Sequence, residues 1–311
     1  MSLNKPIWKL RDWIDKDKLD WGMLSFNPKA IKLLEENPNK INWDNLSMNE
    51  NAIHLLEANP DKICWDLLSI NINAIHLLKK NLNKINWDYL SENKNAIYLL
   101  KANPKKINWS NLSRNENAIH LLEANPKKID WDYLSENKNA IDLLEANPHK
   151  INWSNLSRNE NAIKLLEKHL DKIDWKQLSE NKNAIELLKA NPEKIYWNQF
   201  ALNDNHNAIE IIEDRLENIN KNYPDIYNLI LHVSNWNYLS MNENAIDFLK
   251  QKEDYIVWLD FSANPSIFEL DYEKMKENNQ EMYEDLIKEV MKPSRVFKNP
   301  EYDYLEELFG D

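Results

Sequence analysis

The chain has 311 residues, a formal net charge of −12 and an isoelectric point near 5.2. This acidic balance opposes the attraction to phosphates that dominates nucleic-acid binding, so it counts against DNA or RNA as a partner. A single cysteine, Cys64, excludes an internal disulfide, and no window approaches the ~20 apolar residues that a membrane-spanning helix needs. We therefore expect a protein of a reducing, cytosol-like compartment with no membrane partner.

The first twenty residues lack the pattern that follows them. Their large apolar residues include Trp8, Trp13 and Leu19. Terminal units of repeat proteins differ from internal ones because one of their sides faces solvent. Residues 1–20 are therefore predicted to form an N-terminal capping half-repeat in which these side chains cover the open end of an array.

From Trp21 to Trp197, a tryptophan recurs every 22 residues without a gap. A strict period in this range is typical of a solenoid, in which each unit buries its apolar face only by stacking on its neighbours. With tryptophan as the first position, the unit approximates to W-D-x-L-S-x-N-x-N-A-I-x-L-L-E-A-N-P-x-K-I-N. Positions within a repeat are numbered in this way throughout.

Each repeat is predicted to contain two short helices. The longer one begins near the fifth-position serine, because Ser47 and Glu50 have the spacing of a capping box. Apolar residues follow at helical spacing, and the helix ends at Asn59, since the proline after it disfavours helical geometry. The second helix is expected from Pro60 to Leu68, partly as 3₁₀ helix because its apolar spacing is irregular.

The predicted fold class is all-α, an α-solenoid of about eleven two-helix repeats with atypical N- and C-terminal caps. At interaxial spacings of ~8–10 Å, the stacked repeats would form a rod or arc on the order of 100 Å long. Regular repeats occupy residues 21–202, and the final repeats occupy 236–261. Residues 203–235 are an irregular, degenerate repeat, and residues 262–311 are a C-terminal helical cap with an acidic tail.

The first-position tryptophans are expected to form the structural core of the repeat, since a large aromatic side chain is a usual core filler. A stacking platform for single-stranded nucleic acid or sugars is the alternative, and the net charge disfavours it. The predicted core tryptophans are Trp43, Trp65, Trp87, Trp109, Trp131, Trp153, Trp175 and Trp197. The recurrent seventh-position asparagines, such as Asn49, are expected to bond turn backbone rather than bases.

No catalytic, metal-binding or cofactor-binding pattern stands out. Histidine occupies the twelfth position at His54, His76 and His120, but other repeats carry unlike residues there, which indicates a variable solvent face rather than a zinc site. The sequence contains neither a GxGxxG motif nor a P-loop, and Cys64 has no matched base. We therefore expect no enzymatic activity and no cofactor.

Charges alternate between the central repeats at two positions. The sixth position carries Glu92, Arg114, Glu136, Arg158 and Glu180, and the eighth carries Lys94, Glu116, Lys138, Glu160 and Lys182. If the repeats stack in register, each charge faces opposite charges on both neighbours. Exposed pairs contribute only ~0–1 kcal/mol, so the alternation would fix the register more than the stability. Duplication of a two-repeat block explains the alternation equally well.

The repeat wording resembles that of tandem-repeat proteins encoded in many copies by giant DNA viruses of the mimivirus kind. The resemblance covers Trp21–Trp197 and Trp236–Leu249, and the segments Ser262–Lys276 and Asp285–Lys298 resemble the common ending of that group. It implies a viral protein made in an infected, amoeba-like host. The implied location is the host cytoplasm or viral factory, with the virion as a second location.

The expected function is that of a scaffold that binds another protein, viral or host, along an extended face. The frame of the repeat holds while its twelfth position varies, so the variable side chains are the candidate contacts. They are His54, His76, Tyr98, His120, Asp142, Lys164 and Glu186. A self-assembling structural component of the virion or factory is the alternative, which leaves a homo-oligomer open, and weak nucleic-acid binding is third.

Overall fold

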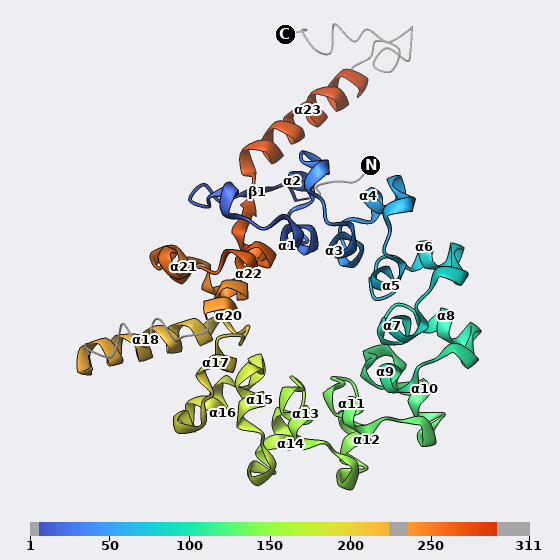
Figure 1. Ribbon diagram of the computed structural model, residues 1–311, viewed down its shortest axis with the longest axis vertical. Coiled ribbons are helices and arrows are strands. Elements are labelled where there is room, and N and C mark those ends of the chain that lie inside the picture. The colour runs from blue at the N-terminus through green and yellow to red at the C-terminus, as the bar shows by residue number, and fades with distance from the viewer. Residues whose placement is uncertain (1–5, 224–235, 291–311) are drawn as a thin grey trace, which may run out of the picture. The chain divides into compact units, whose positions relative to one another are not determined.

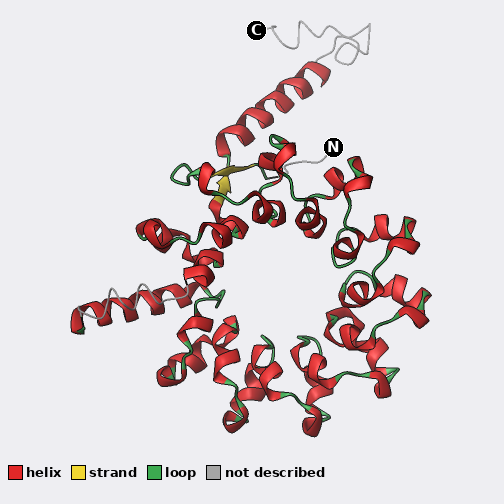
Figure 2. Ribbon diagram, in the orientation of Figure 1, coloured by secondary structure: helices red, strands yellow, loops and turns green. Residues whose placement is uncertain are grey.

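The computed structural model describes residues 6–223 and 236–290, and nearly all of its regular structure is short helices (Figure 2). The prediction of an all-α solenoid is confirmed. The chain forms two compact units. One unit, Asp12–Ile267, contains all the repeats, and the other joins the N-terminal residues up to Arg11 to the C-terminal residues from Phe268.

Two sets of helices alternate along Asp12–Ile267 (Figure 1). The inner helices begin at the first-position tryptophan and lie toward the centre of Figure 1. They are α1 (Trp21–Phe26), α3 (Trp43–Met48), α5 (Trp65–Leu68), α7 (Trp87–Glu92), α9 (Trp109–Arg114), α11 (Trp131–Glu136), α13 (Trp153–Arg158), α15 (Trp175–Glu180), α17 (Trp197–Phe200), α20 (Trp236–Met241) and α22 (Trp258–Ala263).

The outer helices begin at or near the eleventh position of each repeat. They are α2 (Ile31–Glu35), α4 (Ile53–Ala58), α6 (Ile75–Lys80), α8 (Ile97–Ala102), α10 (Ile119–Glu123), α12 (Ile141–Glu145), α14 (Ile163–Glu167), α16 (Ile185–Lys189), α18 (His206–Asn222) and α21 (Ile246–Gln251). A turn of 3₁₀ helix follows most of them. These turns are η2 (Pro38–Lys40), η3 (Pro60–Lys62), η4 (Leu82–Lys84), η5 (Pro104–Lys106), η7 (Pro126–Lys128), η8 (Pro148–Lys150), η9 (Leu170–Lys172), η11 (Pro192–Lys194) and η13 (Glu253–Tyr255).

The predicted capping box at Ser47 is wrong, because the serine lies inside an inner helix. Helix α3 begins after Asn42, whose side-chain oxygen accepts a hydrogen bond from the amide of Asn45 at 3.0 Å. The hydroxyl of Ser47 donates to the carbonyl of Trp43 at 2.8 Å and accepts from the amide of Cys64 at 3.0 Å. The serine therefore ties the end of each repeat back to its own inner helix.

The division of each repeat also differs from the prediction. Asn49 ends α3, and the outer helix α4 begins only at Ile53, so one predicted helix is two separate ones. The turn that Pro60 opens is 3₁₀ helix, as expected, but it stops at Lys62 and does not run on into the next inner helix. Proline at the first position of this turn has no amide hydrogen to leave unbonded.

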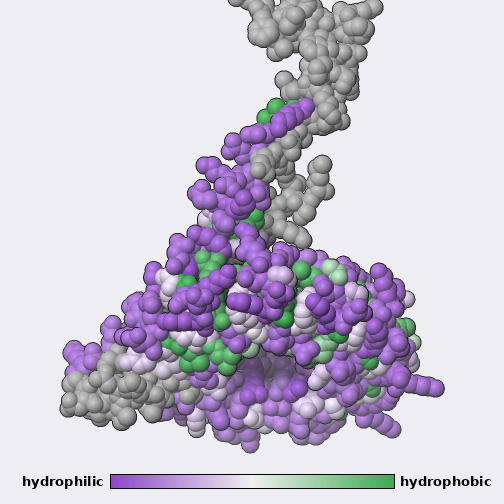
Figure 3. All heavy atoms as spheres, turned by 45° about the horizontal axis from the view of Figure 1, so that its top comes forward, coloured by the Kyte–Doolittle hydropathy of each residue, from purple (hydrophilic) through white to green (hydrophobic). Residues whose placement is uncertain are grey.

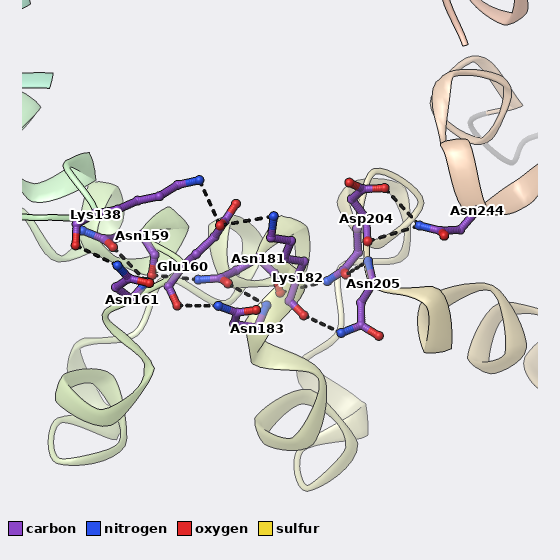
Figure 4. Close-up of polar contacts among 11 residues, drawn as sticks. Lys138, Asn159, Glu160, Asn161, Asn181, Lys182, Asn183, Asp204, Asn205 and Asn244 are labelled. Atoms are coloured by element: carbon purple, nitrogen blue, oxygen red, sulfur yellow. Dashed lines mark hydrogen bonds and ion pairs between the residues drawn. The ribbon is translucent and has the colours of Figure 1, made fainter. Parts of the chain in front are cut away.

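A ladder of buried asparagines joins the inner helices (Figure 4). Each seventh-position asparagine donates both side-chain N–H groups to carbonyls of the preceding inner helix end, at 2.9–3.1 Å. Its side-chain oxygen accepts the amide two residues later, as Asn49 does from Asn51 at 3.0 Å. The ladder asparagines are Asn27, Asn49, Asn71, Asn93, Asn115, Asn137, Asn159, Asn181, Asn203, Asn242 and Asn264. The expectation that these asparagines bond backbone is confirmed.

The ladder has no open end, so Asp12–Ile267 is a closed ring and the predicted rod or arc is wrong. Asn27 donates to the carbonyls of Ser262 at 3.1 Å and Asn264 at 3.0 Å. These are the same bonds that Asn49 makes with the first repeat. Helices α1 and α22 consequently lie side by side (Figure 1). The curvature that sequence cannot show brings the two ends of the array together.

The last repeat is a composite of both ends of the array. In the other repeats that carry the fifth-position serine, its hydroxyl accepts the amide of the residue before the next tryptophan, as Ser91 does from Asn108. For Ser262 of α22, that amide belongs to Asp20, at 2.8 Å. Likewise, the Lys18 ammonium lies 5.0 Å from the ring centroid of Trp258. The segment before α1 thus supplies the half-repeat that follows α22.

The N-terminal residues therefore complete the array, whereas the prediction was that they would cover its open end. Ile14 and Leu19 are buried, and the ring of Trp13 lies 5.9 Å from that of Phe261 in α22. The short turn η1 (Lys16–Lys18) stands where the other repeats have their proline-led turn. The boundaries between the two compact units fall inside the predicted terminal segments. Segment 1–20 is divided after Arg11, and segment 262–311 is divided after Ile267.

The irregular segment is inserted at one joint without interrupting the ladder. Asn242 donates to the carbonyls of Ala201 and Asn203, both at 3.0 Å, although it follows Asn203 by 39 residues. Helix α18 takes the place of a short outer helix, and Ile209, Ile212 and Leu216 are its buried large apolar residues. Residues 224–235 of the predicted irregular repeat lie outside the described residues. The ring therefore tolerates a long insertion because the ladder passes directly from Asn203 to Asn242.

The core of the ring is aliphatic. Every regular repeat buries its fourth, tenth and fourteenth positions completely, as Leu46, Ala52 and Leu56 do. Burying a leucine side chain contributes about 1.5–3 kcal/mol, so these rows supply the main apolar stabilisation of the stack.

The second unit is small. Strand β1 (Trp8–Leu10) pairs antiparallel with β2 (Phe268–Leu270), and Lys9 faces Glu269 in the register. The side chain of Arg11 also approaches Glu269, at 3.4 Å. Helix α23 (Tyr272–Val290) follows β2, and the predicted acidic tail after it, residues 291–311, lies outside the described residues.

Candidate protein-binding surfaces

The seven candidate contact residues at the twelfth position all lie exposed on outer helices. The first three touch the preceding repeat. His54 Nε2 lies 2.8 Å from Glu35 Oε1, and His76 Nε2 lies 2.8 Å from Glu57 Oε1. Tyr98, three-quarters exposed, has the Lys79 ammonium 5.9 Å from its ring centroid. These side chains form a row along the outside of the ring and do not converge on one point.

Two later members of this row contact residues of their own outer helix. His120 Nδ1 lies 3.4 Å from Glu123 of its own helix, and Glu186 lies 3.6 Å from Lys189. Asp142 and Lys164 are exposed on α12 and α14. Among the described residues, no group of three or more histidine, cysteine, aspartate or glutamate side chains could hold a metal ion.

The predicted core tryptophans are half-buried, and lysines cover many of them. The ammonium at the twentieth position lies 4.3–4.6 Å from the ring centroid of the tryptophan in its own repeat, as for Lys62 over Trp43 and Lys150 over Trp131. Trp153 instead packs against the ring of His169 at 4.9 Å. A cation over an exposed ring contributes roughly 0.5–1 kcal/mol. The tryptophans therefore lie at the edge of the core, and a cation or a histidine ring covers one face of most of them.

One groove between repeats has two exposed apolar side chains on its walls. It has a volume of about 810 Å³ and lies between η9 and the segment Glu193–Tyr196. Leu170 and Tyr196, each 51 % exposed, stand on its walls beside Trp175. Leucine replaces the usual proline at the eighteenth position here, and tyrosine replaces asparagine at the twenty-second. These substitutions were the sequence signal for the groove, although only the structure shows that they share it.

The alternating charges meet across repeats, as predicted for stacking in register. Arg114 Nε lies 2.9 Å from Glu136 Oε2, and Arg158 lies 3.9–4.0 Å from both of its glutamate neighbours, Glu136 and Glu180. At the eighth position, Glu160 lies between Lys138 at 2.9 Å and Lys182 at 3.3 Å (Figure 4). Burial alone would raise the pKa of Glu160, but hydrogen bonds and attraction from the two lysines outweigh it, so the pKa is lowered.

Helix α18 has the opposite electrostatic character. Burial and repulsion from Glu217, Asp214 and Glu210 raise the pKa of Glu213 above the usual range of a glutamate. The Arg215 guanidinium lies 4.0 Å from the ring centroid of Trp197, where the regular repeats place a lysine. The inserted helix is therefore an acidic surface joined to the ring by a substitute for the usual cation.

Comparison with protein-family models, with curated proteins and with solved structures found no match to this chain. Among the described residues, no helix has both the length and the apolar composition that crossing a membrane requires. The surface in Figure 3 is mostly hydrophilic, with separate apolar patches. The functional inferences below therefore rest on the geometry of the ring and its exposed side chains.

Proposed function

We propose that the chain is a non-enzymatic scaffold that binds another protein through the exposed face of its outer helices. The observation that carries this proposal is the contrast between a fixed frame and a variable surface. The ladder asparagines and the aliphatic core repeat with almost no change around the ring. The twelfth position, exposed in every regular repeat, carries histidine, tyrosine, acid or lysine. Repeat scaffolds use such variation on a constant frame to recognise partners.

The resemblance of the repeat wording to giant-virus tandem-repeat proteins supports a viral origin for the chain and a viral or host protein as its partner. We infer that it acts in the cytoplasm or viral factory of an infected cell, with the virion as the alternative location. Imaging of the tagged protein in infected cells, together with its measurement in purified virions, tests this placement.

The binding proposal is tested by recovery of a partner from infected cells, followed by binding measurements with that purified partner. In one variant, His54, Tyr98 and His120 are changed to alanine together. The matched control changes three other exposed polar residues of the array, Lys105, Lys127 and His149. We expect the first variant to bind at least about tenfold more weakly and the control to bind like the original protein. Equal weakening in both, or recovery of no specific partner, contradicts the proposal.

Self-assembly into a structural component is the second candidate function. An open solenoid can grow end to end, because each end offers unused hydrogen-bonding groups to another copy. Here the ladder bonds of both array ends are made within the chain, at Asn27 and Asp20, which favours the scaffold over a filament. Light scattering at increasing protein concentration distinguishes the two: a constant monomer mass supports the scaffold, and growing mass supports assembly.

A further inference from the structure

The side chains at the sixth position form a continuous row around the ring. This position is at or just beyond the last residue of each inner helix, next to a ladder asparagine. Neighbouring members of the row lie within contact distance, as the Arg114–Glu136 pair at 2.9 Å and the Arg158–Glu180 pair at 3.9 Å demonstrate. Because the same ladder bonds set the spacing at every joint, the row continues past the charged repeats.

The row consists of two arcs of different chemistry. Five consecutive repeats, from Glu92 to Glu180, carry the alternating charges, and they form the charged arc. The remaining six carry only apolar residues and form the apolar arc. In ring order, the apolar arc is Leu202, Met241, Ala263, Phe26, Met48 and Ile70.

The apolar arc is contiguous only because the ring closes. Its members come from opposite ends of the array, and Phe26 follows Ala263 across the joint where Asn27 bonds the carbonyls of Ser262 and Asn264. On the other side, Asn242 bonds the carbonyls of Ala201 and Asn203, which places Met241 next to Leu202 despite the inserted segment. One surface is thus assembled from residues 20–75 and 200–265.

These apolar side chains face solvent. Phe26 is 43 % exposed, Met241 42 % and Ile70 36 %, while Met48, Leu202 and Ala263 are partly exposed. Single exposed apolar residues are common, but an unbroken row across six repeats is typical of an interaction site. Methionine makes such a surface adaptable, because its unbranched side chain fits differently shaped partners.

Acidic residues flank the apolar arc. The third-position side chain lies beside the sixth position of the preceding repeat, since the Arg114 guanidinium is 3.9 Å from the ring centroid of Tyr133. In the six repeats of the arc, the third position includes Asp260, and the eighth position, two residues after each member of the row, includes Glu50, Asp204 and Glu243; neither position carries lysine or arginine. Two of the repeats carry apolar residues at the third position, with Met23 three residues before Phe26 on α1 and Leu67 three residues before Ile70.

We propose that the apolar arc binds an amphipathic helix of a partner protein, with an apolar stripe on one face and lysine or arginine residues along its edges. The apolar stripe would lie along the sixth-position row, and its basic edges would meet the flanking carboxylates. Because the row curves with the ring, a straight helix can follow about three neighbouring members, which at ~8–10 Å spacing extend over roughly 16–20 Å and match a helix of about 11–13 residues. This inference rests on the proposed scaffold function and adds a second, chemically defined surface to it.

The test uses the full chain and designed peptides of about 11–13 residues in fluorescence anisotropy. One peptide places leucine and methionine at helical spacing with lysines beside them. A second has the same composition in scrambled order, and a third has glutamate in place of lysine. We expect the first peptide to bind with a Kd below about 100 µM and the other two at least about tenfold more weakly. Equal binding of all three peptides, or binding of none, overturns the proposal.

Variants locate the binding on the ring. Changing both Phe26 and Ile70 to serine removes two exposed side chains, so the fold is preserved, and we expect at least about tenfold weaker binding of the lysine peptide. The control changes Glu92 and Glu180 of the charged arc to serine, and its affinity should stay within about twofold. Circular dichroism melting confirms that both variants fold. Equal affinities of the two variants overturn the proposal.

A second copy of the chain is the competing occupant of the arc. A dimer that light scattering detects for the original protein, and that disappears when Phe26 and Ile70 are changed, would overturn the peptide proposal in favour of self-association. The two proposals also fail separately. Loss of peptide binding with intact recognition by the outer row removes only this inference, whereas loss of partner recognition at both surfaces removes the scaffold function as well.

Discussion

Two joints of the ring make the same hydrogen bonds although the chain connects only one of them directly. Between α9 and α11, Asn137 donates to the carbonyls of Ser113 and Asn115, both at 3.0 Å. Between α22 and α1, Asn27 makes the equivalent bonds at 3.0–3.1 Å, with partners at the far end of the array. Neighbouring repeats therefore make the same ladder bonds whether or not the chain connects them directly.

The two joints differ in one row of bonds. Next to the main ladder, ninth-position asparagines donate to the eighth-position carbonyl of the preceding repeat, as Asn139 does to Glu116 at 3.0 Å. The first repeat has Lys29 at this position in place of asparagine. The closing joint thus keeps the buried ladder and the serine bond but lacks one exposed asparagine, which makes it the joint to compare with the others.

The largest expected effect comes from replacing a ladder asparagine by aspartate at each joint. Asn137→Asp and Asn27→Asp each place a buried carboxylate against two carbonyl oxygens and remove two donated bonds, which should lower the free energy of unfolding by about 3–5 kcal/mol. The measurement is urea unfolding followed by circular dichroism.

The joints should then differ in shape. Asn27→Asp separates two segments that no short connection holds together, so the ring opens and small-angle scattering should show a larger radius of gyration. Asn137→Asp leaves its repeats connected by the chain. An unchanged radius in Asn27→Asp, at a concentration of urea below its transition, would contradict the comparison.

The next largest effect concerns one buried residue at the twenty-first position. Leu19 belongs to the composite repeat and Ile151 to the regular array, and both are nearly buried. Replacing either by alanine leaves a cavity that costs about 2–4 kcal/mol. Leu19→Ala should in addition increase the accessibility of the N-terminal segment to proteolysis, because Leu19 is part of the packing that holds that segment against α22. Equal proteolysis of both variants would mean that the composite repeat is as firmly joined as the others.

A smaller effect is expected on the pH dependence of stability, in which Glu160 of the array and Glu213 of α18 should differ in sign. The lowered pKa of Glu160 stabilises the fold above the usual glutamate range, and this contribution is lost as the pH falls through the folded-state pKa. The raised pKa of Glu213 has the opposite sign, with stability lost as the pH rises through it. At neutral pH, Glu160→Gln should therefore lower the melting temperature and Glu213→Gln should raise it. Both differences should vanish in acid, and effects of the same sign would contradict the assignment.

The smallest effect is expected for the alternating charges at the sixth and eighth positions. Exchanging the charges of Arg114 and Glu116 puts like charges next to each other at both positions. Since these pairs are partly exposed, the loss of stability should be about 1 kcal/mol or less at low salt and near zero at high salt. Thermal unfolding at the two salt concentrations measures it. No change at any salt would leave sequence duplication as the explanation of the alternation.

The solenoid class, the number of repeats and the register of the charges could be predicted from sequence, because each depends on neighbouring repeats alone. The helix boundaries could not, because Ser47 has the spacing of a capping residue and acts as a bridge inside α3. A serine hydroxyl suits both roles, and the choice depends on where the amide of Cys64 lies in three dimensions.

Ring closure could not be predicted from the sequence either. A small rotation at every joint decides whether the array is an arc or a circle, and no residue pattern states that angle. The clue was present in Asp20 and Lys18, which match the last positions of a repeat that has no beginning. Without closure, Phe26 and Met241 appear as unrelated exposed residues, and the apolar arc could not be found.

The composite repeat also determines the order in which the protein folds. Elsewhere the ladder joins residues 22–24 or 39–41 positions apart, but the closing bonds join residues separated by 235–242 positions. Local contacts form fast and distant ones form slowly, so the array should stack first and close last. Until α22 has been synthesised, the N-terminal half-repeat has no partner in its own chain. At high concentration it can complete the last repeat of another molecule, which makes domain swapping the expected error of refolding.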